Sequence, residues 1–163
     1  MTSRASVPLA EALLLGAWIG AALLFIAVVA PAAFSVLPSR TLAGALVGRV
    51  LPVLFYAGVV IGSVIVILDV VARTGTWGRA AAGAVSALSC AVAQLVVGTR
   101  IDRLRTEIGG PLEALAGDDP RRVAFGKLHA VSVAWLGIAI VAALVALALA
   151  ARALRQPSPS PTI

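Results

Sequence analysis

The sequence predicts an all-α integral membrane protein: a four-helix bundle with an amphipathic extension before the fourth helix. Four apolar runs of 20 or more residues occupy about Leu9–Val29, Val50–Val71, Gly78–Gly98 and Leu128–Ala151. A helix needs about 20 residues to cross the hydrocarbon layer of a bilayer. Hydrophobic residues make up 61% of the 163-residue chain, which is too apolar for a soluble domain of this size. The runs do not alternate apolar and polar residues as membrane barrel strands do.

The first helix is predicted over about residues 9–29. It ends near Ala30-Pro31 because proline disfavours a helical conformation in the residue before it. Gly16 and Gly20 form a GxxxG pattern, which permits close helix approach in lipid. Glu11 stands at the start of this run and counts against a cleaved signal peptide. The segment Phe34–Arg49 is expected to be a connection or a short interfacial helix.

The second helix is predicted over about residues 50–71, entered through Leu51-Pro52, because proline is tolerated in a first helical turn. Gly58 and Gly62 form a second GxxxG pattern. Asp69 and Arg73 are four residues apart and share a helix face, so we expect an interfacial ion pair between them.

The third helix is predicted over about residues 78–98, with Trp77 at the level of the lipid headgroups. Its small and weakly polar residues suit a helix packed inside the bundle. Gln94 is expected to face the bundle because an amide is costly against lipid. Cys90, the single cysteine, is expected to be a small buried hydrophobe.

The amphipathic extension covers about Thr99–Gly117, where apolar residues recur at steps of three and four. It either prolongs the third helix as far as Gly109-Gly110-Pro111 and then resumes, or lies flat on the membrane. Asp119 as N-cap and Pro120 at the first position predict a fourth helix over about 120–154. Residues 1–155 therefore form one four-helix domain, and residues 156–163 are a low-complexity tail expected to be disordered.

The net charge of +6 arises from basic residues at the ends of the apolar runs, where they contact lipid headgroups and set topology. We expect the lipid bilayer as partner, with a homo-oligomer or a membrane partner left open, and no nucleic acid. Arginine and lysine at the two ends number 5 on the side of the termini and 8 on the other. The positive-inside rule therefore favours termini outside the cell. A small Ala- and Arg-rich chain of this kind suits a bacterial plasma membrane.

His129 is the single histidine, and at the start of an apolar run it is expected to face the bundle interior. A structural role would give it a hydrogen bond to Gln94 or Tyr56. A functional role would make it a haem or metal ligand or a proton relay, within an oligomer if it acts as a metal ligand. The candidate polar site contains six residues: His129, Ser132, Phe125, Tyr56, Gln94 and Arg100.

Most enzyme classes are excluded by pattern. The sequence has none of the short motifs of zinc proteases, serine hydrolases or nucleotide-binding loops. We expect no paired carboxylates inside the membrane, no catalytic residues and no cofactor, so the protein is predicted not to be an enzyme.

Several motifs carry a family resemblance, and they occur in the order Gly16-Ala-Trp18, Phe34-Ser-Val-Leu-Pro38, Gly48-Arg49-Val-Leu-Pro52 and Phe125-Gly-Lys-Leu-His129. From about Leu13 to Gly137 the chain resembles the family of transmembrane protein 205 and its bacterial relatives, a four-helix membrane domain of unknown function. The family often has an Asn one or two turns after the Ser of the fourth helix, and this chain has Val133-Ala-Trp135-Leu136 there. The resemblance also implies a distant similarity to copper-resistance-D-like membrane domains, some of which are linked to copper or haem.

Two functions follow from these patterns. The first is a non-enzymatic membrane protein that acts through binding or interaction, by family association in resistance to toxic compounds. The alternative is a haem- or metal-binding membrane protein that uses His129.

Overall fold

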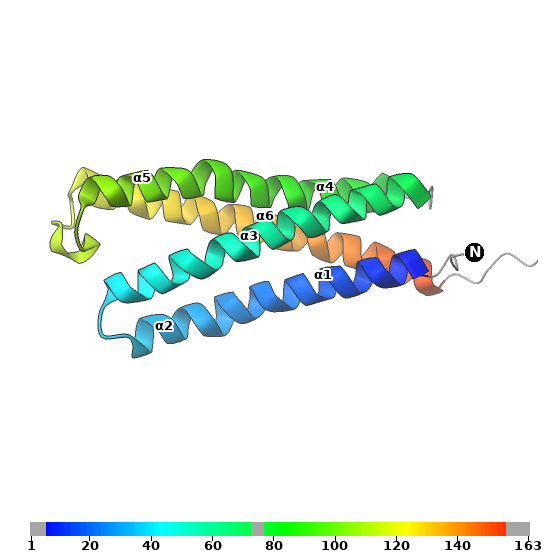
Figure 1. The fold of residues 1–163 in the computed structure, drawn as a ribbon, viewed down its shortest axis with the longest axis horizontal. Coiled ribbons are helices and arrows are strands. Elements are labelled where there is room, and N and C mark those ends of the chain that lie inside the picture. Colours follow the sequence, from blue (N-terminus) through cyan, green and yellow to red (C-terminus); the bar gives the residue numbers. More distant parts are fainter. Residues whose placement is uncertain (1–5, 73–76, 156–163) are drawn as a thin grey trace, which may run out of the picture.

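The fold is described by a computed structural model, which places residues 6–72 and 77–155. Four helical spans in these ranges are long and apolar enough to cross a membrane: Ser6–Val36, Arg40–Val71, Trp77–Ile108 and Pro120–Arg155. They run side by side as an antiparallel bundle (Figure 1). The described residues contain no strand, so the predicted all-α membrane bundle is confirmed. Arg73 and the predicted tail at 156–163 lie outside the described residues.

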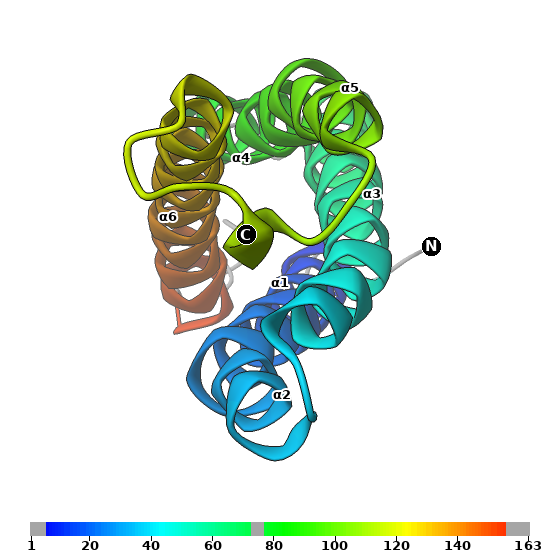
Figure 2. The same cartoon turned by 90° about the vertical axis from the view of Figure 1, so that its left-hand side faces the viewer.

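Each span packs against two neighbours around a common axis (Figure 2). The first span lies between α3 (Arg40–Ala72) and α6 (Pro120–Arg155), and α4 (Trp77–Ala91) closes the ring between them. One end of the bundle, here called the Trp77 end, holds the start of the first span, the start of α4 and the end of α6 (Figure 1). The opposite end, here called the Gly109 end, holds the other connections.

The first span continues past the predicted stop at Ala30-Pro31. It consists of α1 (Ser6–Leu24), a π-helical turn η1 (Phe25–Val29) and α2 (Ala30–Val36). The amide of Ala30 donates to the carbonyl of Phe25, five residues back. This wider turn rearranges the backbone hydrogen bonds just before Pro31, which has no N–H to donate. Local π adjustments of this kind let proline remain inside membrane helices, so the predicted end near residue 29 was wrong.

The second span starts ten residues before the predicted position. Its helix α3 begins at Arg40, after Ser39, whose hydroxyl accepts a hydrogen bond from the amide of Leu42 at 3.2 Å. This N-cap starts the helix, and Pro52 lies inside it. The predicted connection over Phe34–Arg49 was therefore wrong, since only Leu37–Ser39 separates the two helices.

The third span continues through η2 (Val92–Gly98) into α5 (Thr99–Ile108). Gly109 ends it in the left-handed conformation at φ 63°, which glycine adopts without strain. A short 3-10 turn, η3 (Leu112–Ala114), follows. Of the two predicted alternatives for Thr99–Gly117, the prolonged helix that breaks at Gly109 is confirmed.

The predicted start of the fourth helix is also confirmed. The carboxylate of Asp119 accepts the amide of Arg121 at 2.8 Å and the guanidinium of Arg121 at 2.9 Å. These hydrogen bonds lower the pKa of Asp119 to about 2. The helix α6 begins at Pro120 and continues to Arg155.

The close packing of the bundle depends on small residues where α3 crosses α4. A Cβ atom at Gly62 would lie 2.6 Å from the backbone oxygen of Gly83. One at Gly58 would lie 2.5 Å from the sulfur of Cys90 and 2.8 Å from the Trp18 ring. The indole of Trp18 donates to the carbonyl of Leu54 at 2.9 Å. The GxxxG pattern of the second span thus makes a close helix contact, and Cys90 is fully buried as expected.

Candidate intramembrane charged site

The six residues predicted to form a polar site do not converge in the described chain. His129, Tyr56 and Arg100 are exposed on the bundle surface, Gln94 and Phe125 are half-buried, and Ser132 is buried. Among the described residues, no hydrogen bond or ion pair joins any two of the six. Phe125 instead lies under the guanidinium of Arg105, 5.4 Å from the ring centre.

The expectation that His129 faces the bundle interior was wrong. It continues the buried stripe of α6 that includes Ser132, Leu136 and Ala139. At the Gly109 end, however, α2 diverges from α6 and packs on α3 (Figures 1 and 2). The helix that would cover His129 is therefore displaced, and its side chain is exposed.

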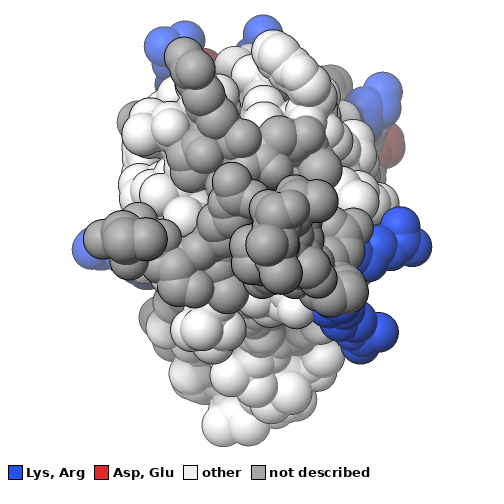
Figure 3. Space-filling view, turned by 90° about the vertical axis from the view of Figure 1, so that its right-hand side faces the viewer, with Lys and Arg blue, Asp and Glu red and all other residues white. Residues whose placement is uncertain are grey.

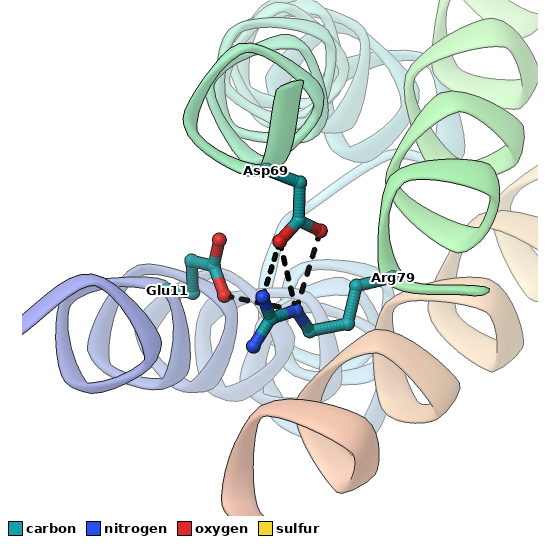
Figure 4. A network of polar contacts seen from close by, with 3 residues as sticks. All are labelled: Glu11, Asp69 and Arg79. Atoms are coloured by element: carbon teal, nitrogen blue, oxygen red, sulfur yellow. Dashed lines mark hydrogen bonds and ion pairs between the residues drawn. The ribbon is translucent and has the colours of Figure 1, made fainter. Parts of the chain in front are cut away.

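The buried charges lie at the other end, where three helices each contribute one charged residue (Figure 4). Glu11 comes from α1, Asp69 from the end of α3 and Arg79 from the start of α4. We call these residues the carboxylate–arginine cluster. Their exposed fractions are 0%, 6% and 2%. The expectation that no paired carboxylates lie inside the membrane was wrong.

Asp69 and Arg79 form a hydrogen-bonded ion pair within the cluster. The Nε atom of Arg79 donates to both carboxylate oxygens of Asp69, at 3.0 and 3.2 Å, and its Nη2 atom also donates to Asp69. Glu11 is held more loosely: its nearer carboxylate oxygen lies 3.4 Å from Nε of Arg79. Among the described residues, neither carboxylate oxygen of Glu11 has a hydrogen-bond partner.

Counted over the described residues, the charges of this cluster do not balance. Two ionised carboxylates and one guanidinium leave a net charge of −1 among three buried side chains. Such an excess charge is costly at low dielectric, and ionisable groups inside membranes are functional candidates for that reason. The arrangement can bind one more positive charge. It can also tie three helices together through Arg79.

Sequence reasoning missed this cluster because it considered each charge within its own segment. It paired Asp69 with Arg73, which lies outside the described residues, and did not consider Arg79, which donates to Asp69 across the connection. One signal was available. Glu11 stands near the start of the first run, Asp69 near the end of the second and Arg79 near the start of the third. In an antiparallel bundle these three positions meet at the same end.

The described residues contain no group of three or more His, Cys, Asp or Glu side chains placed to hold a metal ion. On α3, Tyr56 lines a shallow apolar hollow together with Val53, Ala57, Val60 and Ile61. This hollow opens on the outer surface and holds no charged side chain.

The charged cluster lies largely within a recognisable family segment. Residues 13–109 match the family described as a domain of unknown function (DUF4149), which is more than half of the chain. The chain belongs to the DUF4149 family. The DUF4149 segment includes Asp69 and Arg79, begins two residues after Glu11 and ends before α6. No curated protein and no solved structure matches the chain.

Proposed function

We propose that this DUF4149 protein is a non-enzymatic, multi-pass membrane protein of the transmembrane protein 205-like type. It acts by binding a positively charged ligand inside the membrane, at the carboxylate–arginine cluster. A bacterial plasma membrane is the proposed location.

One observation carries the proposal: a fully buried Glu11 stands beside an Asp69–Arg79 pair that is already neutral. A purely structural tie between helices needs one carboxylate for one guanidinium. The second carboxylate adds a desolvation cost, and a bound positive charge would offset that cost.

The binding proposal does not use His129. Its imidazole is exposed, and the described residues contain no group of three or more His, Cys, Asp or Glu side chains placed to hold a metal ion, so a metal site there needs ligands from a second molecule. The packing of the described chain does not favour that alternative over the cluster.

Thermal unfolding of the purified full-length protein in detergent tests the proposal. The midpoint is measured across pH and with sodium, calcium and tetraphenylphosphonium salts, at constant ionic strength. We expect acidification or one of these cations to raise the midpoint of the wild-type protein. Glu11→Gln removes the excess charge and is expected to abolish that response while leaving the protein folded.

The matched control is Glu107→Gln, which removes an exposed carboxylate at the Gly109 end and should respond like the wild type. The proposed binding role would be contradicted if pH and the added cations shifted the midpoint of the wild-type protein no more than they shift that of Glu11→Gln.

A further inference from the structure

Glu11 differs from the other buried charges of the bundle in how it is partnered. Asp69 receives the hydrogen bonds of the Arg79 guanidinium. Glu11 is fully buried, contacts the same guanidinium at 3.4 Å and has no hydrogen-bond partner among the described residues. Figure 4 shows its carboxylate directed toward Arg79, in the space between α1 and the pair formed by α3 and α4.

The other charged groups around Glu11 in the described chain do not neutralise it. From α3 the facing group is Asp69, which repels it, and from α4 it is Arg79, which Asp69 already holds. The basic residues of α6 at this end, Arg152 and Arg155, are exposed to the surroundings. Glu11 is the one charged residue in the described part of the first span.

We infer that Glu11 is a proton-binding site, and that a proton is the positive charge that completes the carboxylate–arginine cluster. This inference rests on the proposed binding function and names its ligand. In the protonated form the cluster is neutral, with Asp69 and Arg79 as an ion pair and Glu11 as a carboxylic acid. Releasing the proton leaves a carboxylate that competes with Asp69 for the guanidinium of Arg79.

A proton suits this space better than a larger cation. Metal cations prefer several oxygen ligands at once, and calcium takes six to eight oxygen ligands. The cluster offers two carboxylates, one of which is engaged by Arg79. A proton needs one carboxylate oxygen and no coordination shell.

Infrared spectroscopy of the full-length protein in lipid nanodiscs tests the inference, because a protonated buried carboxyl has a C=O stretch separate from that of a carboxylate. We expect this band in the wild-type protein near neutral pH, and its loss on going to alkaline pH. Glu11→Gln should remove the band, Glu11→Asp should keep it at a shifted frequency, and the Glu107→Gln control should leave it unchanged.

Asp69→Asn gives a readout that a structural role for Glu11 would not produce. With Asp69 neutral, the guanidinium of Arg79 can pair with Glu11, so we expect Glu11 to ionise and the band to disappear near neutral pH. Circular dichroism and thermal unfolding identify variants that fail to fold, and the comparison of Glu11→Asp with wild type remains if Asp69→Asn does not fold.

The inference is overturned if no variant-sensitive band exists between mildly acidic and mildly alkaline pH. A metal or organic cation that still stabilises the wild type through Glu11 would then preserve the proposed binding function with a different ligand. If neither the infrared band nor stabilisation by a cation depended on Glu11, the inference and the proposed function would both be overturned.

Discussion

Arg79 is the residue on which the Trp77 end of the bundle depends, because it faces both buried carboxylates. Removing one member of a buried ion pair leaves an uncompensated charge and costs about 3–5 kcal/mol. We therefore expect Arg79→Met to lower the thermal unfolding midpoint strongly. Glu11→Gln should leave the midpoint near neutral pH close to that of the wild type, since an amide replaces a carboxyl group that we infer to be protonated at that pH.

A triple variant separates charge from packing at this cluster. Glu11→Gln, Asp69→Asn and Arg79→Met together remove every ionisable group, and we expect most of the stability lost in Arg79→Met to return. Arg103→Met is the matched control, because Arg103 is exposed on α5. A triple variant no more stable than Arg79→Met would mean that the stem of Arg79 contributes through packing and not through its charge.

The crossing of α3 and α4 shows how elements approach closely through glycine. A methyl group at Gly62 would contact the backbone oxygen of Gly83, which cannot move without shifting α4. Overpacking of this kind costs about 1–3 kcal/mol, so we expect Gly62→Ala to lower the unfolding midpoint clearly. Gly16→Ala is the matched control, because a methyl group there would have no described atom within 4 Å.

The two GxxxG patterns therefore have different roles although their glycines have the same spacing in sequence. Gly58 and Gly62 lie at the helix crossing, whereas Gly16 and Gly20 lie on the outer face of α1. Equal losses of stability in Gly62→Ala and Gly16→Ala would show that the α3–α4 contact is not the determining one.

The distribution of charge over the whole molecule predicts its orientation in the membrane. Basic residues crowd the Gly109 end, as the sequence count indicates. At the Trp77 end Arg79 is buried and neutralised by Asp69. Viewed from the Trp77 end, the visible Lys and Arg side chains lie around the rim of the molecule (Figure 3). The positive-inside rule therefore predicts that the Gly109 end lies in the cytoplasm and the carboxylate–arginine cluster toward the outer face.

Cysteine labelling of intact cells with a membrane-impermeant maleimide measures this orientation. In a Cys90→Ala background, Trp77→Cys and Glu107→Cys place a thiol at exposed positions on opposite ends. We expect Trp77→Cys to react in intact cells, and Glu107→Cys to react after the cells are opened. The reverse pattern would place the cluster on the cytoplasmic side.

Sequence alone determined the class of this protein and the existence of its four spans. Long apolar runs must satisfy their own backbone hydrogen bonds in lipid, so length and composition suffice to predict helices. The N-cap Asp119-Pro120 and the break at Gly109 were also predictable, because capping and left-handed backbone depend on neighbouring residues. The helix boundaries predicted from Pro31 and Pro52 were wrong. A π turn carries the first span past Pro31, and the N-cap at Ser39 starts the second span before Pro52.

Tertiary structure decided which polar residues meet. His129 continues the buried stripe of α6, yet the divergence of α2 leaves it exposed. Glu11 and Arg79 are 68 positions apart in sequence and meet because antiparallel spans bring alternate run ends together. Periodicity assigns residues to faces of one helix. Which face another helix covers depends on packing between spans, and the pattern within a single span does not contain that information.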